Sequence, residues 1–372
     1  MSCLYPLERL VPAAHLTGEE GVNRAPDVIK QIAANDDLAA IHAWLSRYTD
    51  TEKQHTFRDH RKEAERLLLW AIAEAGKPLS SITVEDCVRF RSFLADPQPA
   101  ARWIGPRTKR FSTGWRPFSG RLSPASRRHA EAVVGSLFAW LKDVGYLAGN
   151  PWKAMGRIRV STTSGRVDRI LNTALWGGIA KDVLALPNDT VSVRLRFLVM
   201  ALYLTRARIA ELAAVKMSSV FEIHRGNRVQ WWLSIMGKGG KARDVPIPGL
   251  MPFLREYRAA LGLPAYPAGE DRPLIGHLHR PAAHLTANGM HALVKGYLQD
   301  AAERLQRPEI VRASAHWFRH SSASHGLDGG ESLQSVRESL GHASLQTTSI
   351  YVHADRDRQY DAFEKMGNSL AG

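Results

Sequence analysis

Apolar residues recur at intervals of three and four positions along much of the chain, which is the spacing of helices that bury one face. The first such stretch begins near Asp36, and its expected buried face consists of Leu38, Ile41 and Trp44. The second covers 57–75, and its expected buried face consists of Ala64, Leu67, Leu68 and Ala71. Residues 1–35 show weak periodicity, so we interpret them as an N-terminal arm with some helix.

Two more helices have recognisable starts. Thr83 is a predicted N-cap followed by acidic residues, and this helix should reach about Leu94 and bury Val88 and Phe93. The next helix should begin with Ser123 as its cap and Pro124 at the first helical position. Its apolar stripe consists of Val133, Val134, Leu137, Phe138 and Leu141, and Gly145 fits the position just past its end. These patterns predict a helical unit over 36–148.

From residue 170 onward the pattern is again mostly helical, with one exception. The stretches 220–223, 229–236 and 243–247 are rich in β-branched and aromatic residues. Gly237, Gly239 and Gly240 supply a turn between the last two. We therefore expect a small antiparallel sheet on a helical body, and a fold that is mainly α.

Length and charge extend this picture. The chain has 372 residues, which favours two domains, and its formal net charge is +14. Such an excess predicts a polyanionic partner, either nucleic acid or an acidic membrane. Two cysteines, Cys3 and Cys87, are too few for a disulfide framework. The cysteine usage fits a reducing cytoplasm, and we see neither a signal peptide nor an apolar run long enough to span a membrane. The expected localisation is cytoplasmic, with nucleoid association if the polyanionic partner is DNA.

The positive charge is concentrated in two segments. No acidic residue occurs between Asp96 and Glu131, where aromatic residues alternate with the basic residues Arg102, Arg107, Lys109, Arg110, Arg116, Arg121, Arg127 and Arg128. This mixture favours contact with DNA phosphates, although a solvated loop whose aromatic residues pack on the core is the alternative. The stretch 149–169 holds Lys153, Arg157, Arg159, Arg166 and Arg169 against a single acidic residue. We interpret it as a basic linker that follows a phosphate backbone.

Four short segments carry candidate chemistry. In 204–212, Arg208 precedes a helical pattern and is placed to bind a phosphate, or alternatively to pair with Glu211 at i,i+3. In 237–243, Lys238 lies on a glycine hairpin from which it can donate a proton, with Lys241 and Arg243 beside it as candidate DNA contacts; an ordinary solvated turn is the alternative.

The third segment, 314–320, places His316 and Arg319 one helical turn apart. Zinc binding by His316 and His320 is disfavoured, because Trp317 occupies the position of the glutamate that follows the first histidine in metalloproteases. In the fourth segment, 340–353, Gly341 should end one helix, and a lone Tyr351 closes the run.

The order of these residues resembles the catalytic half of the tyrosine recombinase, or phage integrase, family. The resemblance covers roughly 170–353, is strongest in 315–353, and is carried by Arg208, Lys238, His316, Arg319, Leu340-Gly341-His342 and Tyr351. It implies that Arg208 and Arg319 clamp the scissile phosphate with help from His316 and His342. It also implies that Tyr351 is the nucleophile, and the hairpin position of Lys238 makes it the candidate general acid.

The resemblance implies a two-domain, DNA-clamping architecture, with a helical core-binding domain of SAM-like fold and an α+β catalytic domain. It also implies a 3′-phosphotyrosyl intermediate, a tetramer that forms on double-stranded DNA with inverted-repeat core sites, and no cofactor. An accessory DNA-binding protein is a further candidate partner. Two guanidinium groups and an imidazole can neutralise the reacting phosphate without a metal, and the phosphotyrosine conserves bond energy, so no ATP is needed.

Arg206 departs from the family pattern, which has Gly at this position, and Phe318 replaces the common Leu. The tail 354–372 carries an apolar stripe that needs a surface to cover. Packing on its own domain is one interpretation, whereas the family resemblance implies docking on a neighbouring protomer. The short arm favours a mobile-element recombinase or an Xer-like resolution system over a large phage integrase. A type IB topoisomerase, a hairpin telomere resolvase and a non-catalytic DNA-binding accessory protein are the remaining alternatives.

Overall fold

The computed structural model describes residues 4–25, 29–50, 54–155, 170–237 and 240–341. The chain divides into two compact units, Met1–Val160 and Ser161–Gly372. Predictions for most of the basic linker, for the tip of the hairpin and for the tail lie outside the described residues. No helix in the described ranges is long and apolar enough to cross a membrane.

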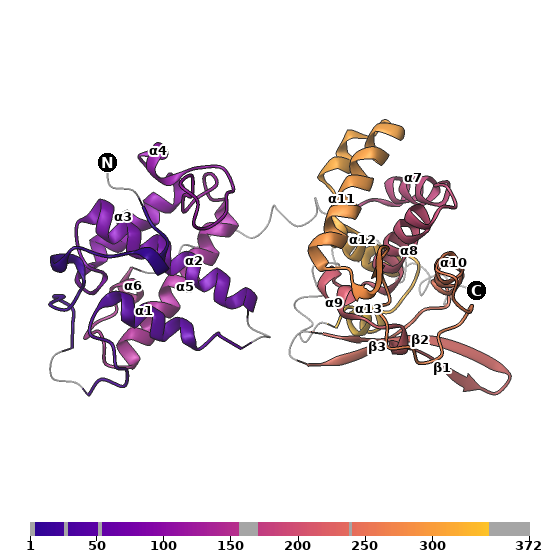
Figure 1. The fold of residues 1–372 in the computed structure, drawn as a ribbon, viewed down its shortest axis with the longest axis horizontal. Coiled ribbons are helices and arrows are strands. Elements are labelled where there is room, and N and C mark those ends of the chain that lie inside the picture. Colours follow the sequence, from indigo (N-terminus) through magenta and orange to yellow (C-terminus); the bar gives the residue numbers. More distant parts are fainter. Residues whose placement is uncertain (1–3, 26–28, 51–53, 156–169, 238–239, 342–372) are drawn as a thin grey trace, which may run out of the picture. The chain divides into compact units, whose positions relative to one another are not determined.

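The first unit is helical (Figure 1). Its four longer helices are α1 (Asp37–Ser46), α2 (Gln54–Trp70), α3 (Val84–Ala95) and α5 (Pro124–Asp143). The helices α4 (Ala100–Trp103) and α6 (Pro151–Ala154) are single turns. A π-helical turn, Ala71–Ala75, extends α2, and 3₁₀ turns span Leu7–Arg9, Ala14–Leu16 and Leu79–Ser81. The predicted helices are therefore confirmed, and their apolar faces meet in one core.

The predicted helix starts are confirmed in atomic detail. Thr83 and Asp86 form a reciprocal capping box, and Ser123 accepts a hydrogen bond of 3.2 Å from the backbone N–H of Ser126. The prediction that α3 buries Val88 is wrong, because 49% of this residue is exposed. The buried face of α3 is centred on Phe90, so Val88 lies on the opposite side of the helix.

The arm and the basic segment 96–131 both pack on this unit. The backbone N–H of Leu7 donates to Glu65 Oε2 at 2.9 Å, and the guanidinium of Arg24 lies 4.0 Å from the ring centre of Tyr146. Trp103 and Phe118 are 0% and 1% exposed. These two aromatic rings therefore pack on the core, which was the alternative to DNA contact for this segment, and they anchor the segment there.

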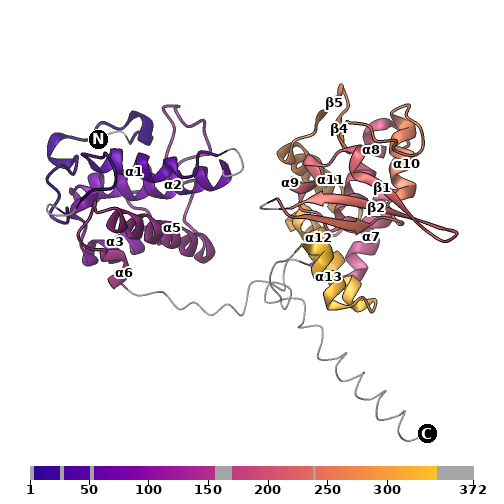
Figure 2. The same ribbon diagram turned by 90° about the horizontal axis from the view of Figure 1, so that it is seen from below.

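The second unit places helices on one side of a small sheet (Figures 1 and 2). Its helices are α7 (Thr173–Leu184), α8 (Thr190–Thr205), α9 (Ile209–Ala214), α10 (Met251–Ala260), α11 (Ala287–Arg304), α12 (Ala315–Asp328) and α13 (Leu333–Leu340), with 3₁₀ turns at Met217–Ser219 and Pro308–Arg312. Helix α8 is buried and contacts α7, α10, α11 and α12. The mainly α fold with a small sheet is confirmed.

The predicted antiparallel sheet is also confirmed, in the order β1 (Val220–Arg225), β2 (Arg228–Met236) and β3 (Ala242–Pro246). Leu233 pairs with both Val220 and Val245, and all three side chains are buried against the helices. A second antiparallel pair, β4 (Gly276–His277) and β5 (Arg280–His284), was not predicted. These strands are too short for an alternating pattern to stand out.

Candidate active site

Arg208 lies at the start of α9, as predicted. Helix α8 ends at Thr205, Arg206 adopts the left-handed conformation, and Arg208 is the N-cap residue of α9. Its Nη1 donates to Glu211 Oε1 at 2.6 Å, and its backbone N–H donates to Glu211 Oε2 at 2.9 Å. The pairing with Glu211 therefore exists, yet 40% of the Arg208 side chain remains exposed. The guanidinium is held on one side and accessible on the other.

Arg319 reaches the same carboxylate from α12. Its Nη1 lies 4.0 Å from Glu211 Oε2, and its side chain is only 2% exposed. Nη1 also donates to the backbone carbonyl of Arg206, and Nη2 donates to that of Leu340. Two arginines that are far apart in the sequence thus meet beside one acidic group. The Arg319 side chain is thus buried, in contrast to the exposed side of Arg208.

Glu211 receives a third arginine, Arg243 on β3. Arg243 Nη2 donates to Glu211 Oε2 at 2.6 Å, and Arg243 Nε donates to the carbonyl of Ser339 at 2.9 Å. Burial of the Glu211 carboxyl raises its pKa, but the hydrogen bonds from Arg243 and Arg208 outweigh burial and leave the pKa below its ordinary value. The carboxylate stays ionised, and three guanidinium groups around it leave an excess of positive charge.

Arg243 was predicted to contact DNA, whereas the structure shows a different use. Its side chain is 10% exposed and links α9 to the last turn of α13. Glu211 appeared in the sequence only as an ion-pair alternative for Arg208. Its role as the common partner of three arginines depends on contacts between α9, α12 and β3, which no local pattern reveals.

His316 lies in the first turn of α12 and is exposed, one turn before Arg319. Its Nε2 lies 2.8 Å from Nε2 of His320, and the two rings are perpendicular. His316 and Arg319 are therefore on one helix, as predicted, but with different access to solvent. Across the parts of the chain that the structure describes, no three His, Cys, Asp or Glu side chains cluster as metal ligands would.

Lys238, His342 and Tyr351 lie outside the described residues, although the residues before the first two are described. A Cβ added to Gly237 would lie 3.5 Å from Nη1 of Arg243, and one added to Gly341 would lie 3.1 Å from the same atom. Gly341 ends α13 with a φ of 62°, as the sequence predicted. The chain positions that lead into Lys238 and His342 therefore both contact the arginine that binds Glu211.

Several predicted DNA contacts in the segment 96–131 are occupied within the unit. Arg102 pairs with Glu74 at 3.0 Å, Arg121 pairs with Asp96 at 2.9 Å, and Arg116 donates to the carbonyl of Trp115 at 2.8 Å. Arg110 binds both Glu8 and the buried Glu65. Arg102 and Arg110 thus connect the segment to the rest of the unit, whereas Arg116 and Arg121 bond within the segment.

Other predicted contacts are exposed. Arg107, Lys109, Arg128, Lys153 and Lys241 are exposed, Arg127 is half-buried, and Arg157 and Arg159 lie outside the described residues. Arg128 and Lys153 line one groove along α5 and α6, together with Trp152. A Cβ on Gly135 would lie 3.1 Å from Trp152 Cδ1, so the absence of a side chain there lets the indole pack against α5.

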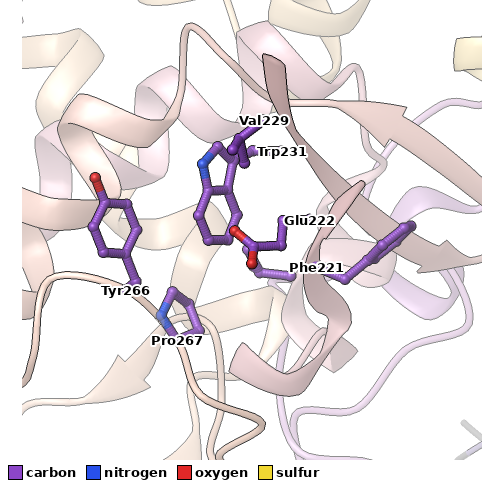
Figure 3. A pocket seen from close by; sticks show the side chains of 7 residues that line it. Phe221, Glu222, Val229, Trp231, Tyr266 and Pro267 are labelled. Carbon is purple, nitrogen blue, oxygen red and sulfur yellow. The ribbon is translucent and has the colours of Figure 1, made fainter. Parts of the chain in front are cut away.

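A second hollow lies between the β1–β2 hairpin and residues 266–267 (Figure 3). The ring of Trp231 stacks on Tyr266 with 5.1 Å between the ring centres, and Glu222 projects into the same space (Figure 3). Its lining contains a carboxylate but no arginine or lysine. Because the Glu222 carboxylate would repel a phosphate and no cationic side chain of the lining offsets it, this hollow is poorly suited to bind the DNA backbone.

The model of the Phage integrase family matches residues 180–358. Tyrosine recombinase XerC of Herpetosiphon aurantiacus is 28% identical over 315 residues, which is 82% of this chain and 88% of that protein. XerC of Mycobacterium bovis is 30% identical over 235 residues, which is 60% of this chain and 70% of that protein. XerH recombinase bound to a palindromic difH substrate has the same fold, with a TM-score of 0.62 at 19% identity over 96% of this chain and 98% of that one. The chain therefore belongs to the phage integrase family of tyrosine recombinases.

Proposed function

We propose that this protein cleaves and rejoins DNA strands at specific sites through a covalent 3′-phosphotyrosyl bond to Tyr351. The observation that carries the proposal is the convergence of Arg208 and Arg319 on Glu211, next to the position where α13 ends. The phenol of a tyrosine has an ordinary pKa near 10, so nearby guanidinium groups would stabilise the phenolate during attack.

The two arginines are suited to a phosphate in different ways. Arg208 is anchored by Glu211 yet 40% exposed, so it can present N–H donors to an incoming oxygen. Arg319 is fixed by backbone carbonyls of Arg206 and Leu340, and its burial strengthens the field that it exerts on charge developing nearby. His316, on the exposed first turn of the same helix, would add a neutral or cationic donor.

Lys238 and His342 are proposed to complete the site. Their preceding residues, Gly237 and Gly341, both lie against Arg243, which supports a common location for the hairpin and the end of α13. Lys238 would donate a proton to the leaving 5′-oxygen. Attack by Tyr351 forms one phosphorus–oxygen bond as another breaks, so the bond energy is retained for the reverse step.

The partner that fits this chemistry is double-stranded DNA with inverted-repeat core sites. We propose that residues 36–148 form the core-binding domain and 170–353 the catalytic domain, joined by the basic linker 149–169. Four protomers would exchange two pairs of strands, and the tail 354–372 would dock on a neighbouring protomer. A solved tetramer of lambda integrase bound to a Holliday junction has this fold, with a TM-score of 0.52 at 17% identity.

For the biological role, the relatives favour a second candidate beside integration and excision for a mobile element. The matching proteins include XerC and XerD recombinases at 27–30% identity, which supports an Xer-like resolution of chromosome or plasmid dimers. The position of the recognition sequence separates the two roles. A single chromosomal copy supports dimer resolution, whereas copies at both ends of an insertion support a mobile element.

The chemistry is tested by covalent trapping. Duplexes bound by the full-length chain are selected from a randomised pool, and the selected sequence is rebuilt with a nick near the cleavage position. The wild type should become covalently attached to this duplex, whereas Tyr351→Phe should bind it and remain unattached. Attachment by Tyr351→Phe, or binding without any attachment by the wild type, would overturn the proposal. Relaxation of supercoiled DNA by a monomer without a paired site would instead support a topoisomerase.

A further inference from the structure

Arg206 occupies a backbone position that usually requires glycine. Its φ is 54° and its ψ is 22°, in the left-handed region that residues with a Cβ rarely adopt. In the resembling family this position holds glycine, so the arginine introduces an unfavourable backbone conformation that glycine would avoid. Such an arginine needs a compensating role in the surrounding structure.

The Arg206 side chain uses its full set of donors inside the protein. Nε donates to Ser322 Oγ at 3.1 Å, and Nη2 donates to the Ser322 carbonyl at 3.1 Å. Nη1 and Nη2 donate to the two carboxylate oxygens of Glu331 at 3.0 and 2.6 Å, and Nη1 also donates to Ser339 Oγ at 2.8 Å. A guanidinium has five N–H donors, so all of them are engaged and none is left for DNA.

The neighbouring structure is shaped around this bridge. A Cβ on Gly326 of α12 would lie 2.3 Å from Nη2 of Arg206 and 2.4 Å from Oε2 of Glu331. Only glycine at this helical position leaves room for the ion pair. Burial raises the pKa of the Glu331 carboxyl, but the Arg206 guanidinium outweighs burial and holds the pKa below its ordinary value.

The bridge adds to two other contacts between α13 and α12, which are a small apolar cluster and the hydrogen bond from Arg319 to the carbonyl of Leu340. In the part of the chain that the structure describes, this cluster consists of Ala323, Leu327, Val336 and Leu340, with Leu333 partly buried beside them. Glu331 lies just before α13 and Ser339 in its last turn, so Arg206 holds both ends of this eight-residue helix. The two helices lie side by side in Figure 2.

The position of the Arg319 guanidinium is set by the end of α8 and the end of α13, which Arg206 joins. Its guanidinium donates to the carbonyl of Arg206 itself and to the carbonyl of Leu340 at the end of α13. We propose that Arg206 is a positioning residue, which sets Arg319 and the end of α13 for the reaction by clamping α13 to α8 and α12. This inference rests on the proposed phosphate-binding role of Arg319.

Two variants separate this role from general stability. Arg206→Gly relaxes the backbone while removing the clamp, and Glu331→Gln keeps the side-chain shape while removing the charge. On the nicked duplex, each should form the covalent bond about 10- to 100-fold more slowly than the wild type, because small displacements of a reacting group have effects of this size. DNA affinity should stay within about threefold. Glu338→Gln is the matched control, since this exposed carboxylate of α13 accepts a hydrogen bond from the side chain of Gln334 and lies outside the Arg206 bridge.

A substrate with an uncharged methylphosphonate at the scissile position gives the readout that a merely structural defect would not change. Arg319 has less charge to neutralise on this duplex, so the losses for Arg206→Gly and Glu331→Gln should shrink to a few-fold. Equal losses on both substrates would overturn the inference. Hydrogen exchange of residues 333–341 should be faster in both variants and unchanged in Glu338→Gln, and unchanged exchange in both would also overturn it.

The outcomes for the two proposals are distinguishable. If the wild type forms no covalent bond and Arg319→Ala changes nothing, the proposed function fails, while hydrogen exchange still reports on the clamp. If the wild type reacts, Arg319→Ala slows it, and Arg206→Gly and Glu331→Gln react like the wild type, then the clamp has no positioning role.

Discussion

The carboxylate of Glu65 lies inside the helical unit, with 3% of its side chain exposed. It is held by the guanidinium of Arg110 and by the backbone N–H of Leu7. A buried charge of this kind is tolerable only while its partners remain, because removing one leaves an uncompensated ion in a poorly solvated place. Arg110 therefore stabilises the attachment of both the arm and the segment 96–131 to α2.

Replacing Arg110 by alanine should lower the free energy of unfolding by roughly 3 kcal/mol, the usual cost of breaking a buried ion pair on one side. Urea unfolding followed by circular dichroism measures this change. Arg107→Ala is the matched control in the same segment, and as an exposed side chain it should change the free energy of unfolding by less than about 0.5 kcal/mol. Similar small changes for both variants would show that Arg110 has no structural role.

The sequence could not reveal these pairs, because the acidic partners are remote. No acidic residue lies between Asp96 and Glu131, and the partners of Arg110, Glu8 and Glu65, come from the arm and α2. The same holds for Arg206, because Ser322, Glu331 and Ser339, which are distant in the sequence, accept hydrogen bonds from all the N–H groups of its guanidinium. Charge along a sequence does not show which charges the fold neutralises.

At the scale of elements, the start of α3 combines a capping box with an ion pair. Asp86 Oδ2 accepts from the backbone N–H of Thr83 at 3.2 Å and lies 2.8 Å from Lys77 Nζ. Burial raises the pKa of the Asp86 carboxyl, but the contacts with Lys77 and Thr83 outweigh burial and leave the pKa below its ordinary value. The carboxylate form thus stabilises the folded state.

Asp86→Asn should therefore lower the free energy of unfolding by about 1–2 kcal/mol at pH 7, the range for losing a helix cap. The folded pKa lies below the unfolded one, so the unfolded chain binds protons first as the pH falls. The difference between variant and wild type should be constant above about pH 5 and shrink as the pH falls below about 4. Urea titrations between pH 7 and 3 measure it, with the exposed Asp59→Asn as a control that should show little effect. A gap that grows in acid would contradict the sign.

Helix starts such as Thr83 and Ser123 could be predicted because a cap is a local arrangement of side chain and backbone. The buried face of α3 was harder to predict than its start. Contacts with other helices, rather than residues adjacent in the sequence, decide how α3 is rotated. Val88 lies on the solvent side although it is apolar, since Phe90 and Leu94 face the core. The strands β4 and β5 escaped prediction for a related reason, as pairing rather than pattern defines them.

At the scale of the whole molecule, the site is assembled from elements far apart in the chain. Arg208 on α9, Arg243 on β3 and Arg319 on α12 meet only because the helices pack around α8. The sequence indicated Arg208 and Arg319 through their resemblance to a family, not through spacing. Neither Glu211 as their common partner nor the burial of Arg319 followed from any local pattern.

The net charge of +14 is also a property of the whole molecule, and the exposed basic side chains are the ones that can contact DNA phosphates. Arg128 and Lys153 line one groove of the helical unit and are exposed.

If each contacts a phosphate, the double variant Arg128→Ala/Lys153→Ala should reduce the slope of log affinity against log salt by about 2, because each contact contributes roughly 0.9. Fluorescence anisotropy of a labelled duplex at several salt concentrations measures this slope. Lys142→Ala, an exposed cation in the last turn of the same helix α5, should leave the slope unchanged. A slope that the double variant does not alter would place the phosphate contacts on other cations and make this groove a feature of the fold alone.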